Sequence, residues 1–261
     1  MAAQAFNFDS THGYRLAGKL ELPDGVPRGW AILAHCFTCG KDVLAASRIA
    51  RALASNGVGV LRFDFAGLGT SGGSFADATF AADVADLVAA GDALAAAGQT
   101  PTLLIGHSLG GAAVLAAAGA MPEVRAVVTI GAPADVAHVL HQFDPASLAT
   151  IESHGEAEVQ LAGRPFIVRK TFIDDARQHD LKARIADLRR PLLVMHSPRD
   201  ATVGIDNAAG IFAAAKHPKS FISLDDADHL LTRRADADYT ATMIAAWAAR
   251  YLLPDAEGPG A

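Results

Sequence analysis

Three residues with the chemistry of an activated nucleophile follow one another along the chain: Ser108, Asp200 and His229. A serine hydroxyl is a poor nucleophile near neutral pH, so it needs a base that takes its proton and an acid that orients the base. Imidazole and carboxylate side chains supply these two roles. If the fold brings the three together, they predict attack on a carbonyl carbon and a covalent acyl intermediate that water releases.

Ser108 lies in the pattern Gly106-His-Ser-Leu-Gly110. The apolar run 102–105 before it is typical of a strand buried on both faces, and the apolar residues 112–121 after it are typical of a helix. A serine on a sharp strand-to-helix turn needs glycines two positions before and after it, because side chains there would collide with neighbouring strands. The helix N-terminus also offers unpaired N–H groups to an anion. Ser108 is therefore the candidate nucleophile.

Asp200 and His229 each come directly after a predicted strand, 191–196 for the acid and 220–224 for the base. Because the carboxyl ends of parallel strands meet at one edge of a sheet, we expect both side chains on the same rim as Ser108. Three further carboxylates precede the histidine and are second-ranked alternatives for the orienting acid: Asp225, Asp226 and Asp228.

The tetrahedral intermediate of acyl transfer carries an oxyanion that needs N–H donors. The residue after the nucleophile supplies one of them, the backbone N–H of Leu109. The loop after the first buried strand, 29–35, supplies the other, which we assign to the backbone N–H of Phe37.

Strands alternate with helices over most of the chain. Apolar runs predict strands at 29–35, 58–65, 102–105, 124–130, 191–196 and 220–224. The first helix is predicted to point these residues inward: Val43, Leu44, Ile49 and Leu53. The second helix is predicted to turn most of its acidic residues to solvent: Asp83, Asp86 and Asp92. This alternation predicts an α/β fold with a mostly parallel sheet and helices on both faces. A hairpin over residues 5–22 is predicted to form the first strands of this sheet.

The alternation breaks between residues 133 and 188, where a small hairpin at 158–168 is flanked by helical stretches. We interpret this segment as a cap insertion within a single domain that spans residues 1–261. The polar, Gly- and Pro-containing tail at 254–261 is predicted to be disordered.

Composition excludes several classes of partner. A formal net charge of -6 argues against a basic surface that binds nucleic acid. No apolar run is long enough to span a bilayer, and we expect neither a signal peptide nor binding to a membrane. We therefore expect a cytoplasmic protein whose partner is a small-molecule acyl substrate, while its oligomeric state stays open.

Two motifs suggest other chemistry. Residues Gly67–Gly72 match the dinucleotide pattern G-x-G-x-x-G, but the acidic residue at the required distance, Asp86, lies inside a predicted helix and not at a strand end. Cys36 and Cys39 could form a redox pair or half of a metal site, but no second cysteine pair exists. We favour two small thiols in a loop, and we expect no cofactor and no metal.

Several motifs together resemble the serine α/β-hydrolases, and above all the hydrolase half of fusion proteins whose other half is an OsmC-like peroxide-resistance domain. The matching segments are His35–Asp42, Phe63–Gly69, Gly106–Gly111, Arg199-Asp200 and Asp228-His229. The resemblance extends from about residue 5 to residue 252 and departs from the family at Cys36, where glycine is usual. It implies an eight-stranded sheet and hydrolysis of an ester or related acyl bond. It also puts Ser108, Asp200 and His229 at catalytic positions, and Phe37 and Leu109 at oxyanion positions.

The residues and the resemblance together predict a carboxylesterase for small acyl esters, with a preference for acyl chains of about two to six carbons because the cap is short. The fold and the three residues do not determine the bond that is cleaved, so a serine aminopeptidase and a C–C bond hydrolase remain alternatives. A catalytically idle binding protein on the same fold is the alternative outside the enzymes.

Overall fold

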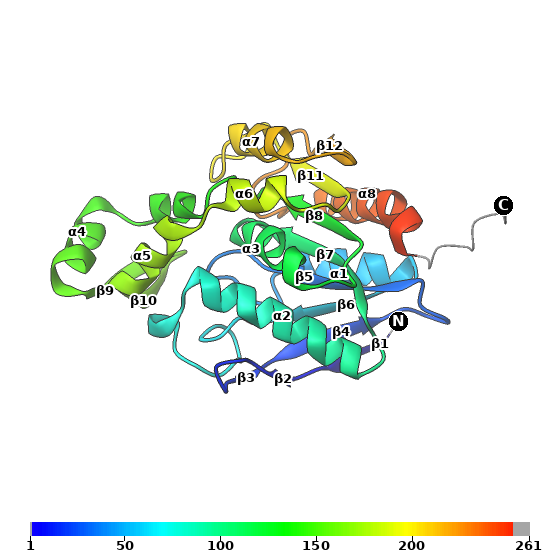
Figure 1. Ribbon diagram of the computed structural model, residues 1–261, viewed down its shortest axis with the longest axis horizontal. Helices are drawn as coiled ribbons and strands as arrows, with labels where there is room; N and C mark the ends of the chain where they lie inside the picture. Colours follow the sequence, from blue (N-terminus) through cyan, green and yellow to red (C-terminus); the bar gives the residue numbers. More distant parts are fainter. Residues whose placement is uncertain (1, 253–261) are drawn as a thin grey trace.

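An eight-stranded sheet runs through residues 2–252, the part of the chain that the computed structural model describes (Figure 1). Its strand order is β1-β4-β6-β5-β7-β8-β11-β12, with β1 and β4 antiparallel to their neighbours and the other strands parallel. The strands are β1 (Ala2–Ala5), β4 (Gly18–Leu22), β5 (Gly29–Ala34), β6 (Val58–Phe63), β7 (Pro101–His107), β8 (Ala126–Ile130), β11 (Leu192–His196) and β12 (Lys219–Ser223). The tail at 254–261 lies outside the described residues.

Helices cover both faces of this sheet, as the alternating pattern predicts. One face carries α1 (Leu44–Ser55) and α8 (Arg234–Leu252), and the other carries α2 (Phe80–Ala96), α3 (Leu109–Ala117), α6 (Leu181–Ala186) and α7 (Asp206–Ala214). Successive side chains of a strand point to opposite faces, so β5 sends Ala31 and Leu33 into the α1/α8 core and Ile32 and Ala34 into the other. The near-continuous apolar runs of the central strands follow from this double burial.

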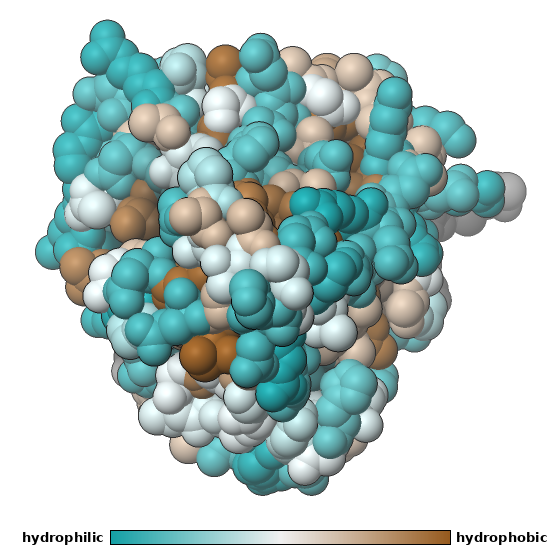
Figure 2. Space-filling view, turned by 90° about the vertical axis from the view of Figure 1, so that its left-hand side faces the viewer, coloured by the Kyte–Doolittle hydropathy of each residue, from teal (hydrophilic) through white to brown (hydrophobic). Residues whose placement is uncertain are grey.

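Residues between β8 and α6 form a segment that projects past the end of the sheet, on the left in Figure 1. It consists of η3 (Val136–Gln142), α4 (Pro145–His154), β9 (Glu156–Leu161), β10 (Arg164–Arg169) and α5 (Lys170–Gln178). β9 and β10 pair antiparallel, so the predicted hairpin is confirmed. Seen from this side, the surface is mostly polar with small, separate apolar spots (Figure 2). α6 does not project with this segment but packs against α3 and α7.

The N-terminal hairpin is more divided than predicted. β2 (Phe8–Asp9) and β3 (Arg15–Leu16) form a small ribbon of their own, while the flanking β1 and β4 pair with each other in the main sheet. Two short 3-10 turns complete the described elements: η1 (Phe75–Asp77) precedes α2, and η2 (Ala118–Ala120) extends α3.

Two orientations predicted from periodicity are wrong. Leu44 is 63% exposed, because it is the first residue of α1 and only the later turns of that helix, with Ile49 and Leu53, reach the core. Asp86 was predicted on the solvent side of its helix, but it is fully buried because the loop after β6 lies over it and Ala66 donates its N–H to the carboxylate at 3.1 Å. Within residues 2–252 no helix combines the length and apolar character needed to cross a bilayer.

Candidate active site

Ser108 occupies the sharp turn between β7 and α3. Its backbone has φ 55° and ψ −126°, a conformation that residues with side chains rarely adopt, and its N–H donates to the carbonyl of Ile130 at 2.9 Å. A Cβ at Gly110 would overlap the carbonyl of His35 after β5, and one at Gly106 would overlap the backbone of Gly110. The expected collision with a neighbouring strand therefore applies to the second glycine, whereas the first is needed by the turn itself.

The side chains of Ser108, His229 and Asp200 form one hydrogen-bonded chain. Ser108 Oγ lies 3.0 Å from His229 Nε2, and His229 Nδ1 lies 2.7 Å from Asp200 Oδ2. Because a carboxylate only accepts hydrogen bonds, Nδ1 carries the imidazole proton and Nε2 is free to accept from the serine hydroxyl. This arrangement can take up the hydroxyl proton as the oxygen attacks an electrophile.

Asp200 is held by the loop that follows β11. The backbone N–H groups of Thr202 and Val203 donate to its Oδ1 at 2.8 and 2.9 Å. Burial opposes the charged form, but the hydrogen bonds from His229 and these two N–H groups outweigh it and lower the pKa of Asp200. The carboxylate is therefore ionised and orients His229.

The alternative acids point elsewhere. Asp226 pairs with Arg233 at 2.7 Å, and Asp228 accepts from the N–H of Thr232 at 3.1 Å. Among the described residues none of the three carboxylates before His229, including the exposed Asp225, hydrogen-bonds its ring. Asp200 is the acid that contacts the imidazole.

The two backbone N–H groups predicted as oxyanion donors have no protein acceptor among the described residues. Leu109 is the first residue of α3, so its N–H has no acceptor inside the helix. The N–H of Phe37, in the loop after β5, likewise donates to no protein acceptor within residues 2–252. Both residues line one pocket beside Ser108, which makes their N–H groups available to a developing negative charge.

The expectation of two separate thiols is wrong, because Cys36 and Cys39 form a disulfide. Their Cα atoms lie 5.2 Å apart, within the usual range for a disulfide. A tight turn brings them together: Cys39 donates its N–H to the carbonyl of Cys36 at 3.0 Å, and Thr38 takes a φ of 58°. The bridge encloses Phe37, the candidate oxyanion donor.

Two buried histidines support the site, and sequence reasoning missed both. His107 Nε2 donates to the backbone carbonyl of His229 at 2.6 Å, and burial next to that second imidazole lowers the pKa of His107 to about 4. His196, at the end of β11, donates from Nε2 to the carbonyl of Val203 at 2.7 Å. In the sequence, His107 is marked only by its position directly before the nucleophile, and His196 only by its position at the end of a strand. Many residues with purely structural roles share such positions, so neither position identifies a functional residue.

The glycine-rich loop 67–73 surrounds a carboxylate of the protein itself. Asp64 accepts from the backbone N–H and the Nζ of Lys41, both at 2.6 Å, and from the N–H of Thr70 at 3.0 Å. Burial opposes ionisation of Asp64, but these hydrogen bonds lower its pKa. A Cβ at Gly69 would overlap this carboxylate, so the glycine serves an internal anion. Within the described chain, no group of three or more His, Cys, Asp or Glu side chains is arranged to hold a metal ion.

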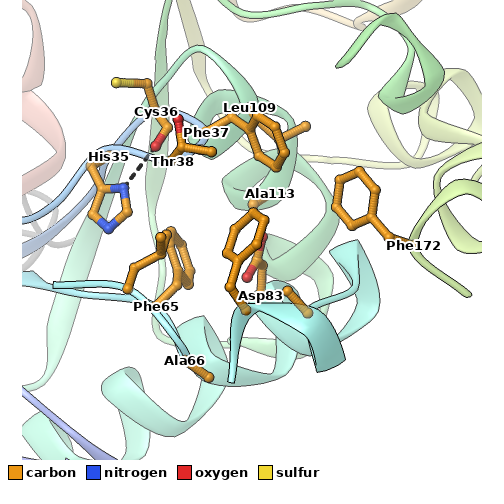
Figure 3. Close-up of a pocket in the computed structure, with 14 residues that line it drawn as sticks. His35, Cys36, Phe37, Thr38, Phe65, Ala66, Asp83, Leu109, Ala113 and Phe172 are labelled. Atoms are coloured by element: carbon orange, nitrogen blue, oxygen red, sulfur yellow. Dashed lines mark hydrogen bonds between the residues drawn. The ribbon is translucent and has the colours of Figure 1, made fainter. Parts of the chain in front are cut away.

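A narrow aromatic pocket adjoins the two candidate oxyanion donors (Figure 3). Phe37 stacks on Phe172 of α5 with ring centroids 5.4 Å apart, and Phe65 and Phe75 complete the aromatic wall. The enclosed space is about 10 Å³, roughly enough for one water molecule. The pocket is therefore nearly filled by its lining side chains, one of which is Phe172 from the projecting segment.

Comparison with protein families matches residues 32–153 to the α/β-hydrolase fold. The esterase domain of a Rhodothermus marinus protein, known from a crystal structure, is 49% identical, with a TM-score of 0.80 over 97% of this chain and 100% of that chain. Est1E from Butyrivibrio proteoclasticus, solved with ferulic acid bound, has a TM-score of 0.83 over 95% of this chain and 99% of its own, but at 19% identity it shows the fold alone.

Among curated proteins, the mitochondrial palmitoyl-protein thioesterase ABHD10 of Mus musculus is 28% identical over 188 residues. The match covers 70% of this chain and 62% of the mouse protein, so the chain spans less than two thirds of that relative's length. The fold, the matched residues and the near-complete overlap with the Rhodothermus marinus esterase domain lead to one conclusion: the chain belongs to the α/β-hydrolase family.

Proposed function

We propose that the protein is a serine hydrolase that cleaves small carboxylic esters through an acyl-enzyme. The observation that carries this proposal is the hydrogen-bonded chain from Ser108 through His229 to Asp200, at 3.0 and 2.7 Å. Such a chain has little structural purpose on a strained turn, and it is the arrangement that activates a serine hydroxyl.

In the first half of the reaction, Ser108 Oγ attacks the ester carbonyl carbon while His229 Nε2 takes the hydroxyl proton. The carbonyl oxygen becomes an oxyanion that accepts hydrogen bonds from the N–H groups of Phe37 and Leu109. The imidazolium then gives its proton to the leaving alkoxide oxygen, the C–O bond breaks, and the acyl group stays on Ser108. Asp200 stabilises the imidazolium throughout and keeps its own charge.

In the second half, a water molecule replaces the alcohol beside His229. Nε2 takes one proton from this water, and the oxygen attacks the acyl carbon while the same two N–H groups hold the oxyanion. Collapse of the intermediate breaks the bond to Ser108 Oγ, which regains the proton from the imidazolium. The products are a carboxylic acid, an alcohol and the unchanged enzyme.

Small substrates are favoured by the size of the pocket and by the character of the projecting segment. An enclosed space of about 10 Å³ does not hold a long acyl chain unless lining side chains such as Phe172 move. The polar surface with separate apolar spots offers no broad apolar face for a lipid interface (Figure 2). The mouse relative is named a palmitoyl-protein thioesterase, and a thioester of a short acyl group fits the same chemistry here better than a palmitoyl group. On the motif resemblance, we also infer that the chain corresponds to the hydrolase half of the OsmC-like fusions.

Covalent labelling tests the proposal. A fluorophosphonate should modify the wild-type protein at Ser108, as mapped by peptide mass spectrometry, and p-nitrophenyl acetate should give a burst of nitrophenol. Ser108→Ala should fold, resist labelling and lose roughly 10³-fold or more in turnover. A folded Ser108→Ala protein that keeps its esterase activity would remove this mechanism. A wild-type protein that neither labels nor turns over would support the idle binding protein, and faster cleavage of aminoacyl-arylamides than of esters would favour a peptidase.

A further inference from the structure

The aromatic pocket lies on the acyl side of the candidate site. Its lining includes Phe37 and Leu109, whose N–H groups are the candidate oxyanion donors, but neither Ser108 nor His229. In the proposed reaction the leaving alcohol must remain beside His229, which protonates it. The substituent on the other side of the carbonyl, toward this pocket, is therefore the acyl chain.

One wall of this pocket carries a carboxylate that the proposed mechanism does not use. Asp83, on α2, lines the pocket across from His35 and Cys36 (Figure 3). Most of the other residues that line the pocket are apolar, among them Ala78, Ala113, Phe75 and Phe172. Within residues 2–252 the Asp83 carboxylate has neither a hydrogen-bond donor nor a basic partner. Asp83 is half-buried, so displacing water from its carboxylate without supplying a partner costs free energy.

The carboxylates near Asp83 favour a cation, whereas the guanidinium of Arg164 reaches the pocket lining only at the carbonyl of Thr38. Asp86 lies one turn further along α2, and α5 contributes Asp175, whose carboxylate accepts from Ala81 and pairs with His179. α3 offers no ionisable side chain, and His35 is buried with its pKa lowered by that burial. Burial, together with Asp86 and Asp175, raises the pKa of Asp83 well above its usual range. The pocket therefore penalises an unpaired carboxylate and would reward an ammonium group that joins it.

We propose that Asp83 is a specificity-determining residue of the acyl pocket and selects acyl groups whose far end carries an ammonium. The inference rests on the proposed function, because it assigns the acyl side of that same site. The ammonium would donate hydrogen bonds to the carboxylate, and the rings of Phe75 and Phe172 would add favourable contacts to its charge. An alkyl chain of equal length would displace water from the half-buried Asp83 without offering it a partner. Phe172 must turn aside to admit either chain.

The test compares p-nitrophenyl esters in pairs with equal numbers of heavy atoms: 3-aminopropanoate with butanoate, and 6-aminohexanoate with heptanoate. The measured quantity is the ratio of kcat/KM for the amine ester to that for its alkyl partner. We expect Asp83→Leu to lower this ratio by about ten- to a hundredfold at one or both lengths, the range for a charge-assisted hydrogen bond. Asp83→Asn, with the same volume and no charge, should give an intermediate ratio and serves as the test if the leucine variant does not fold.

Asp92→Asn is the matched control, because it makes the same change on an exposed position of α2. Its ratio should equal that of the wild type. Taking ratios cancels the intrinsic reactivity of each ester and any general loss of activity. Equal ratios in wild type and both Asp83 variants, at both lengths, would overturn the inference while acetate turnover and Ser108 labelling still support the esterase. A wild-type protein that neither hydrolyses the acetate ester nor labels at Ser108 would contradict the proposed function, and the inference would fall with it.

Discussion

The Nε2 atom of His107 lies 2.6 Å from the backbone carbonyl oxygen of His229. The residue directly before the candidate nucleophile thus fixes the loop that carries the candidate base. Because burial lowers the pKa of His107 to about 4, the ring is neutral near pH 7 and its single proton must be on Nε2 to make this bond. The distance between Ser108 and the His229 ring depends on this contact between β7 and the loop after β12.

Replacing His107 should therefore reduce catalysis without unfolding the protein. We expect His107→Phe, which keeps an aromatic ring but loses the N–H, to lower kcat by about tenfold or more, since one unpaired buried carbonyl costs about 1–3 kcal/mol. KM for a short ester should change little, because His107 does not line the aromatic pocket. His107→Gln, whose amide can donate, should recover part of the loss. A phenylalanine variant with full kcat would show that the loop is held by other contacts.

Replacing Asp200 by Asn should be more severe. The Asn side chain can still accept from Thr202 and Val203, but its NH₂ would then face His229 Nδ1 and favour the wrong imidazole tautomer. We expect kcat to fall by roughly 10³- to 10⁴-fold in a folded protein. Asp226→Asn and Asp228→Asn are controls that should each change kcat by less than about threefold. The reverse pattern in steady-state kinetics would mean that one of those carboxylates orients the base.

The fold follows from local patterns because each strand and helix is coded by residues next to one another. The run Leu103–Ile105 is apolar at every position, so it must be covered on both faces of the sheet. A parallel sheet between two helix layers follows. The edge where Ser108, Asp200 and His229 meet follows from strand direction alone. Leu44 shows the limit of such patterns, since helical spacing cannot tell that the first turn of α1 extends past the core.

Contacts between distant segments decide what local patterns leave open. Asp86 has the polarity of a surface residue, and only the loop at Ala66 makes it a buried acceptor. The hydrogen bond from His107 joins residues 122 positions apart in sequence, and no periodicity records such a pair. The disulfide is local, but it needs the left-handed backbone at Thr38, which the residue type does not favour. For Asp86 and His107, a contact with a distant segment decides the role of the residue.

The disulfide should be dispensable for turnover. Other contacts also hold its loop: Arg164 donates to the carbonyl of Thr38, and His35 Nδ1 lies 2.8 Å from the carbonyl of Cys36. We expect Cys36→Ala/Cys39→Ala to keep kcat/KM within about tenfold of the wild type. Its free energy of unfolding should fall by no more than about 2 kcal/mol, because the loop is so short. Complete loss of turnover, with Ser108 still reacting with fluorophosphonate, would mean that the bridge alone positions the Phe37 N–H.

Dithiothreitol separates the effect of the bridge from that of the side chains. Wild-type protein assayed with the reductant should match the double variant, whereas the double variant itself should not respond. A response of the double variant would show that the reductant acts elsewhere on the protein.

The burial of Asp86 should leave a signature in the pH dependence of stability. Burial raises the pKa of Asp86 from 3.8 to about 6, so between these values the folded protein binds a proton that the unfolded chain has lost. The wild type should therefore lose stability relative to Asp86→Asn as the pH rises from about 4 to 7, by about 3 kcal/mol from this one group. Urea unfolding of both proteins at pH 4.5, 6 and 7.5 measures the difference, in which the pH dependence of groups that do not interact with Asp86 cancels. Asp92→Asn, exposed on the same helix, should give no such trend. A constant difference across this range would mean that Asp86 stays ionised, with a donor that compensates its burial.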